Sequence, residues 1–198
     1  MPKIVNKTEK REKLVQAAIP IFAKYGFRET KMSDIAISAD VGKGTLYEYF
    51  ESKDELFLNT FKLWFSYFSE QMQDIVSKEK NPYKQLVLFY DQFFQTIEQY
   101  GDTYYIYFDF WSELTRNTNI NQQEIVSVYQ SLRELFADIL EDGVQKKVFK
   151  TINCTAMSTA LLSLADGLLM QWLIDRTSFS IKDIGNQAVK AFLGSLLI

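Results

Sequence analysis

Residues 30 to 53 read TKMSDIAISADVGKGTLYEYFESK, and this stretch decides the fold. Apolar residues recur at helical spacing in residues 31–39, so the pattern predicts a short helix that Thr30 caps. A tight turn is expected at residues 40–42, because aspartate tolerates the left-handed conformation. A second short helix is predicted over residues 43–50, where apolar residues lie four apart. Two short helices joined by such a turn are typical of a helix-turn-helix.

Capping signals predict further helices on both sides of this stretch. A long helix with Pro20 inside it is expected over about residues 6–25, and Ser52 with Glu55 forms a capping box that opens another. Later helix starts are marked by Asn81 before Pro82, by Asn153 and by Ser180. The predicted fold class is all-α, with about nine helices: an N-terminal three-helix helix-turn-helix domain and a C-terminal helical bundle.

The composition argues against an enzyme. Histidine is absent from all 198 residues, which removes Ser-His and Cys-His catalysis and the commonest zinc ligand. The chain also lacks a glycine-rich phosphate loop. We therefore expect no catalytic residues, no metal and no cofactor.

The single cysteine and the longest apolar stretch bear on location. Cys154 rules out an internal disulfide and suits a reducing cytoplasm. The apolar stretch at residues 160–174 is broken by Ser163, Asp166, Gly167 and Gln171, so we expect a buried helix and not a membrane span. We also expect no signal peptide, because no apolar segment follows the first basic residues. The expected location is the cytoplasm.

The second short helix has the properties needed to enter a DNA major groove. Gly44 lets the backbone approach closely, Thr45 can bond a phosphate or touch a thymine methyl, and Tyr47 can reach a phosphate. Lys53 opens the next helix, where backbone N–H groups and a cation together suit a phosphate. The predicted DNA-binding residues are Thr30, Lys31, Lys43, Gly44, Thr45, Tyr47, Tyr49 and Lys53. The net charge of −3 does not exclude this face, because binding responds to the local patch.

Together, residues 22–27, 34–36, 41–50 and 52–56 resemble the N-terminal domain of TetR-family transcriptional regulators. The resemblance implies that the third helix reads DNA, with Lys43, Gly44 and Thr45 at the groove and Tyr47 and Lys53 on backbone phosphates. It also implies a DNA-binding domain at residues 1–54 and a ligand-binding and dimerisation domain at residues 55–198. Three positions depart from the family pattern: Asp40 stands where glycine is usual, Gly42 where serine is usual, and Pro20 is unexpected.

Small residues on the last two predicted helices favour a dimer interface. On the first of these two helices, Ala156, Ala160, Ser163 and Gly167 recur on one face at spacings of four, three and four, which lets another helix pack closely. The predicted interface comprises Ala160, Ser163, Gly167, Ala188, Ala191 and Phe192. A two-fold dimer would present two reading helices about 34–36 Å apart, one turn of DNA. The alternative is that these faces pack within one subunit.

Aromatic residues are dense between residues 57 and 111, which favours a pocket for a hydrophobic or aromatic small molecule. The predicted lining is Phe65, Phe68, Phe93, Phe108, Trp111, Tyr129, Asp166 and Trp172. Asp109, Glu113, Asp166 and Gln171 are the candidate polar contacts. Two or more acids in the pocket would favour a cationic lipophile. If these acids face solvent or cap helices, a neutral or fatty ligand fits better.

The favoured function is a ligand-responsive repressor that binds a palindromic operator on double-stranded DNA as a homodimer, with no membrane partner. One alternative is a helix-turn-helix regulator without a small-molecule ligand, constitutive or controlled by a protein partner, which includes an activator. Another is a helical lipophile-binding module or an enzyme, and the composition argues against the enzyme.

Overall fold

A computed structural model describes residues 7–116 and 122–198, apart from the side chains of Phe68 and Thr115. These residues form nine α-helices and one short 3₁₀ helix, which confirms the all-α class. The helices are α1 (Lys7–Glu29), α2 (Met32–Ser38), α3 (Lys43–Tyr49), α4 (Lys53–Lys78), α5 (Pro82–Tyr100), η1 (Gly101–Tyr104), α6 (Tyr105–Arg116), α7 (Gln122–Gln145), α8 (Cys154–Ile174) and α9 (Ile181–Gly194).

The chain divides into two compact units. The first combines the chain up to residue 66 with residues 102–122, and the second combines residues 67–101 with residues 123–198. The first unit therefore holds the helix-turn-helix, the start of α4 and the whole of α6. The division of function at residues 54 and 55 stays a prediction.

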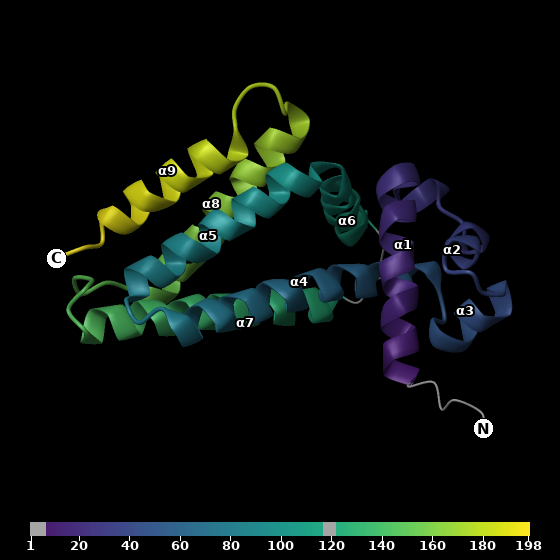
Figure 1. The fold of residues 1–198 in the computed structure, drawn as a ribbon, viewed down its shortest axis with the longest axis horizontal. Helices are drawn as coiled ribbons and strands as arrows, with labels where there is room; N and C mark the ends of the chain where they lie inside the picture. Colours follow the sequence, from purple (N-terminus) through teal and green to yellow (C-terminus); the bar gives the residue numbers. More distant parts are fainter. Residues whose placement is uncertain (1–6, 117–121) are drawn as a thin grey trace. The chain divides into compact units, whose positions relative to one another are not determined.

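In the first unit, α1 packs against α2 and α6, and α2 packs against α3 (Figure 1). Aromatic rings fill the space between α1, α4 and α6: Phe57 lies 4.9 Å from Phe22 and 5.9 Å from Phe110, measured between ring centroids. Phe61 stacks on Phe110 with centroids 3.6 Å apart. This shared core fixes where α6 lies against the helices that carry the helix-turn-helix.

In the second unit, α9 packs against α5 and α8 (Figure 1). Gly185 of α9 makes the close approach possible, because a Cβ there would lie 2.6 Å from ring atoms of Phe94 on α5. The expected caps are confirmed by their hydrogen bonds: the side chains of Asn81, Asn153 and Ser180 each accept a backbone N–H from the first turn of the helix that follows.

Candidate DNA-binding interface and effector site

The turn between α2 and α3 has the geometry that the sequence predicts. Asp40 adopts a left-handed conformation, with φ of 51°. Gly42 is the N-cap of α3, and its carbonyl accepts the N–H groups of Thr45 and Leu46. Leu46 is fully buried, so it anchors α3 to the core and fixes which face of the helix is presented to solvent.

The solvent face of α3 carries the residues expected at the groove. Lys43, Gly44 and Tyr47 are exposed, whereas Thr45 and Tyr49 are half-buried. A Cβ on Gly44 would have no atom within 4 Å, so the backbone is open to an approaching surface. The Lys43 ammonium lies 5.8 Å from the ring centroid of Tyr47, which is 48% exposed. These two side chains thus form one exposed cationic and hydrogen-bonding patch.

Thr30 occupies a different place from the one predicted. The N-cap of α2 is Lys31, so the expectation that Thr30 caps this helix is wrong. Thr30 is only 2% exposed, and its hydroxyl donates to the Gly26 carbonyl at 2.7 Å. It serves the end of α1, because backbone carbonyls in the last turn of a helix have no intrahelical partner. This placement disagrees with a phosphate contact through the hydroxyl, whereas Lys31 is exposed as predicted.

Lys53 also turns toward the end of α1. Its ammonium donates to the carbonyl oxygens of Phe27 at 2.6 Å, Arg28 at 3.0 Å and Thr30 at 3.0 Å. It also lies 4.5 Å from the centroid of the Phe27 ring. Burial lowers the pKa of this ammonium, while the nearby acids Asp54, Glu113 and Glu29 act in the opposite direction.

Two acids of α6 bind the same corner of α1. Asp109 accepts the Phe27 N–H at 2.8 Å, and Glu113 pairs with the Arg28 guanidinium at 2.8 Å. The hydrogen bond from Arg28 to Glu113 raises the pKa of the guanidinium, and the charge of Glu113 adds to it. Both acids were candidate polar contacts of the pocket, and the structure instead gives them a role in holding the helix-turn-helix.

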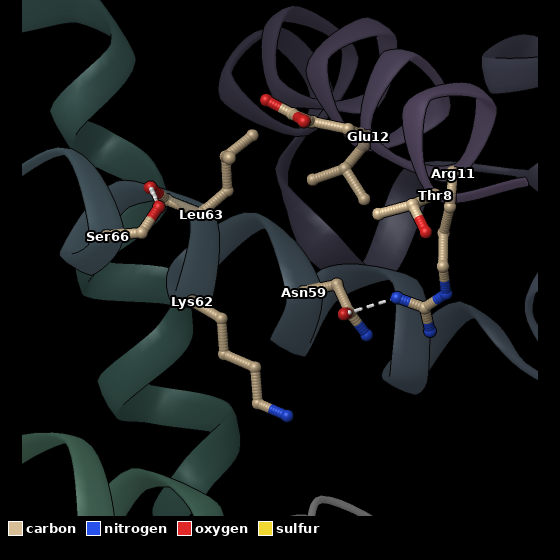
Figure 2. A pocket seen from close by; sticks show the side chains of 8 residues that line it. Thr8, Arg11, Glu12, Asn59, Lys62, Leu63 and Ser66 are labelled. Atoms are coloured by element: carbon tan, nitrogen blue, oxygen red, sulfur yellow. Dashed lines mark hydrogen bonds between the residues drawn. The ribbon is translucent and has the colours of Figure 1, made fainter. Parts of the chain in front are cut away.

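A groove between α1 and the start of α4 lies in the same unit, with a volume of about 290 Å³. It is lined by Thr8, Arg11, Glu12, Val15, Asn59, Lys62, Leu63 and Ser66. Figure 2 shows the Arg11 guanidinium donating to the Asn59 amide oxygen, a contact of 2.6 Å. Arg11 also pairs with Glu55 at 2.6 Å, so this cation already serves to join α1 to α4.

The predicted pocket residues fall into both compact units. Phe65, Phe108 and Trp111 belong to the first unit, and Phe93, Tyr129, Asp166 and Trp172 to the second. The side chain of Phe68 lies outside the described residues. Within the second unit, the Tyr129 hydroxyl donates to Asp166 at 3.4 Å, so the structure brings these two predicted residues together. Trp172 instead packs against Gly101, and Gln171 is exposed.

Tyr90 on α5 is a polar residue that the sequence reading missed. It is 1% exposed, and its hydroxyl has no hydrogen-bond partner in the described part of the chain. Burial raises its pKa, and the charge of Asp166 raises it further. In the sequence Tyr90 stands among apolar positions of an amphipathic helix, where a tyrosine looks like an ordinary core residue. A buried hydroxyl without a partner is costly, and Tyr90 lies in the same unit as the predicted pocket residues Tyr129 and Asp166, so we take the region of these three residues as a candidate site for a ligand.

The predicted interface residues lie on partly uncovered faces. Ser163 and Ala191 are exposed, and Ala160, Ala188 and Phe192 are half-buried. A Cβ on Gly167 would have no atom within 4 Å. Helix α8 is long and apolar enough to cross a membrane by length and composition, a test that core helices of soluble proteins also pass. Only 33% of the most apolar window of α8 is buried within the chain, so the expectation of a buried helix is wrong for much of α8, and apolar surface stays uncovered there.

Helix α3 presents its polar face to solvent, and its Leu46 is buried in the core. This arrangement defines the chain as a helix-turn-helix DNA-binding protein. Residues 14–60 match the model for bacterial regulatory proteins of the tetR family, and residues 82–197 match the model for the C-terminal domain of BetI-type transcriptional repressors. The chain belongs to the tetR family of transcriptional regulators. It is a DNA-binding transcriptional repressor and not an enzyme.

Relatives and solved structures agree along nearly the whole chain. The transcriptional repressor KstR2 of Mycolicibacterium smegmatis is 24% identical over 188 residues, which is 94% of this chain and 90% of that protein. The fatty acid metabolism regulator protein of Bacillus subtilis is 20% identical, covering 96% of this chain and 97% of its own. The crystal structure of FadR from Bacillus subtilis with stearoyl-CoA shares the fold, with a TM-score of 0.77 at 19% identity, over 93% of this chain and 98% of that one.

Proposed function

We propose that this repressor binds a palindromic operator as a homodimer and that a long-chain fatty acyl effector changes its affinity for DNA. The observation that carries the effector class is the placement of Asp109 and Glu113. These acids hold the end of α1, so they are not free to receive a cationic ligand. A neutral or fatty ligand then fits the predicted residues of the second unit, Phe93, Tyr129, Asp166 and Trp172, three of which are aromatic.

The names of similar proteins support the same class. The regulator of fatty acid metabolism and the FadR structure solved with stearoyl-CoA both come from Bacillus subtilis. In this chain the Tyr90 hydroxyl is a buried donor among the rings of Phe93, Phe94 and Phe136. We assign it the acyl carbonyl of the effector, because a carbonyl oxygen would satisfy a donor that otherwise stays unpaired.

On the DNA side, we assign Lys43, Gly44 and Thr45 to the base edges and Lys31, Tyr47 and Tyr49 to the phosphates. The exposed cation and hydroxyl of α3 support this division, since phosphate contacts position a protein and base contacts give specificity. We assign the faces of α8 and α9 to the partner protomer and not to a lipid, because Asp166 and Gln171 interrupt the apolar surface of α8. The repressor would then act in the cytoplasm.

The effector proposal is tested with stearoyl-CoA, stearate and coenzyme A as separate probes. The unaltered chain first selects a duplex from a random-sequence pool, and the affinity for that duplex is measured with each probe. We expect stearoyl-CoA to change the affinity for DNA. We also expect it to raise the free energy of unfolding by about 2.7 kcal/mol when its concentration is 100 times its dissociation constant. A chain that binds the duplex equally with every probe would instead be a regulator without this effector.

A matched pair of variants tests the role of Tyr90. Tyr90→Phe removes only the hydroxyl, and we expect it to weaken stearoyl-CoA binding by about fivefold, the value of one hydrogen bond of about 1 kcal/mol. Tyr104→Phe is the control, because Tyr104 has an equally buried hydroxyl without a partner and lies in the first unit. An equal effect of the two variants would contradict the assignment.

A further inference from the structure

The corner between α1 and α2 is held by its own Thr30 and by contacts from two other parts of the chain, α4 and α6. Gly26 has φ of 74° and ψ of 164°, so the helical path breaks there and the following carbonyls leave the α1 ladder. Thr30 satisfies the Gly26 carbonyl, and Asp109 satisfies the Phe27 N–H. The carbonyls of Phe27, Arg28 and Thr30 all accept from one ammonium, that of Lys53.

Lys53 has no proton left for DNA in this arrangement. An ammonium carries three N–H donors, and each of the three has a backbone carbonyl as its acceptor. A cation at the C-terminal end of a helix is also favoured by the helix dipole. To reach a phosphate, the side chain would have to leave three charge-assisted hydrogen bonds and expose three carbonyls without partners.

We propose that Lys53 is a positioning residue for operator binding and not a phosphate ligand. Lys53 is the first residue of α4, and the carbonyls that it binds lie at the end of α1 and before α2. It therefore ties the start of α4 to the segment that leads into the helix-turn-helix. This link sets how α2, and α3 packed against it, are presented relative to α4.

The position of Lys53 at a helix N-terminus explains why the sequence suggests a phosphate anchor. Backbone N–H groups at such an end favour an anion, and a lysine beside them adds positive charge. In this chain the start of α4 already has a carboxylate in place, since Glu55 accepts the Glu51 N–H at 2.7 Å. The lysine points the other way, to the carbonyl end of α1.

The test separates affinity from its dependence on salt. Lys53→Met keeps the aliphatic stem and removes the ammonium, and Lys43→Met removes the same charge from the exposed face of α3. Both bind the duplex selected by the unaltered chain, at a temperature where circular dichroism shows each variant fully folded. A phosphate contact contributes about 0.9 to the slope of log K against log salt.

For Lys53→Met we expect affinity to fall about tenfold with an unchanged salt slope. A slope reduced by about 0.9 would make Lys53 a phosphate ligand and overturn the proposal. Unchanged affinity in the folded variant would make the residue merely structural, which also overturns it. Lys43→Met shows how large a slope change the loss of one surface charge produces in the same assay.

Lys53→Gln keeps the test decisive if Lys53→Met does not fold. Glutamine is uncharged, but its amide retains two donors for the carbonyls of the corner. The proposal expects Lys53→Gln to bind DNA more tightly than Lys53→Met, or to fold where Lys53→Met does not, and to keep the salt slope of the unaltered chain. A salt slope in Lys53→Gln that is lower by about 0.9 would contradict it.

Discussion

A leucine at Gly167 should separate the stability of the protomer from the stability of the dimer. Within one chain, a Cβ at Gly167 meets no atom within 4 Å, so a larger side chain fits. Replacing glycine inside α8 also improves helix propensity by up to about 1 kcal/mol. The folded protomer should therefore tolerate Gly167→Leu or gain stability from it.

In the proposed dimer the same leucine lies where a helix of the partner packs closely. Overpacking costs about 1–3 kcal/mol for each site, and two-fold symmetry places the substitution at the interface twice. The cost of about 2–6 kcal/mol raises the dimer dissociation constant by between about 30-fold and about 10⁴-fold. Operator affinity should fall with it, because two linked reading helices bind two half-sites.

Sedimentation equilibrium measures the dissociation constant, and far-ultraviolet circular dichroism checks the helix content. Gln92→Leu on the exposed surface of α5 is the control, since it adds a leucine to a helix outside the predicted interface. The reasoning is refuted if Gly167→Leu leaves the dimer as tight as Gln92→Leu does.

Three other predictions follow from the packing and the buried groups. Gly185→Ala should lower the free energy of unfolding of the second unit by about 1–3 kcal/mol, because the new Cβ would lie 2.6 Å from the ring of Phe94. Chemical denaturation measures this change, and equal midpoints for the variant and the parent would contradict the close packing. Asp109→Ala leaves the N–H at the end of α1 without its acceptor, so the unfolding free energy should fall by about 1–3 kcal/mol, with faster hydrogen exchange at that amide as the local check. The pKa values of Tyr90 and Tyr104 are raised in the folded state above the ordinary value of 10.0. The free energy of unfolding is therefore unaffected by these groups below pH 10, and it falls above that pH because the tyrosines ionise in the unfolded chain. The unfolding free energy should then fall by about 1.4 kcal/mol per pH unit for each tyrosine, and a curve that stays flat above that pH would show that the hydroxyls ionise in the fold.

The sequence by itself determined most of the helices and the recognition element. Caps act within three residues, so the side chains of Asn81, Asn153 and Ser180 could be assigned from local spacing, and the structure confirms their hydrogen bonds. The left-handed turn at Asp40 and the buried side of α3 at Leu46 are equally local features. The class of protein followed from them, because a helix-turn-helix is defined by short elements at fixed spacing.

Only the tertiary structure decided which polar groups face the corner of α1. The Lys53 ammonium bonds to carbonyls 23 to 26 residues away, and Asp109 and Glu113 reach residues 82 and 85 positions earlier. No helical periodicity relates residues so far apart. Local patterns therefore predicted a phosphate as the partner of Lys53, and an effector as the partner of Asp109 and Glu113. Packing of α4 and α6 against α1 brings these charges to unpaired backbone groups, and a buried backbone group requires a partner wherever in the chain that partner comes from.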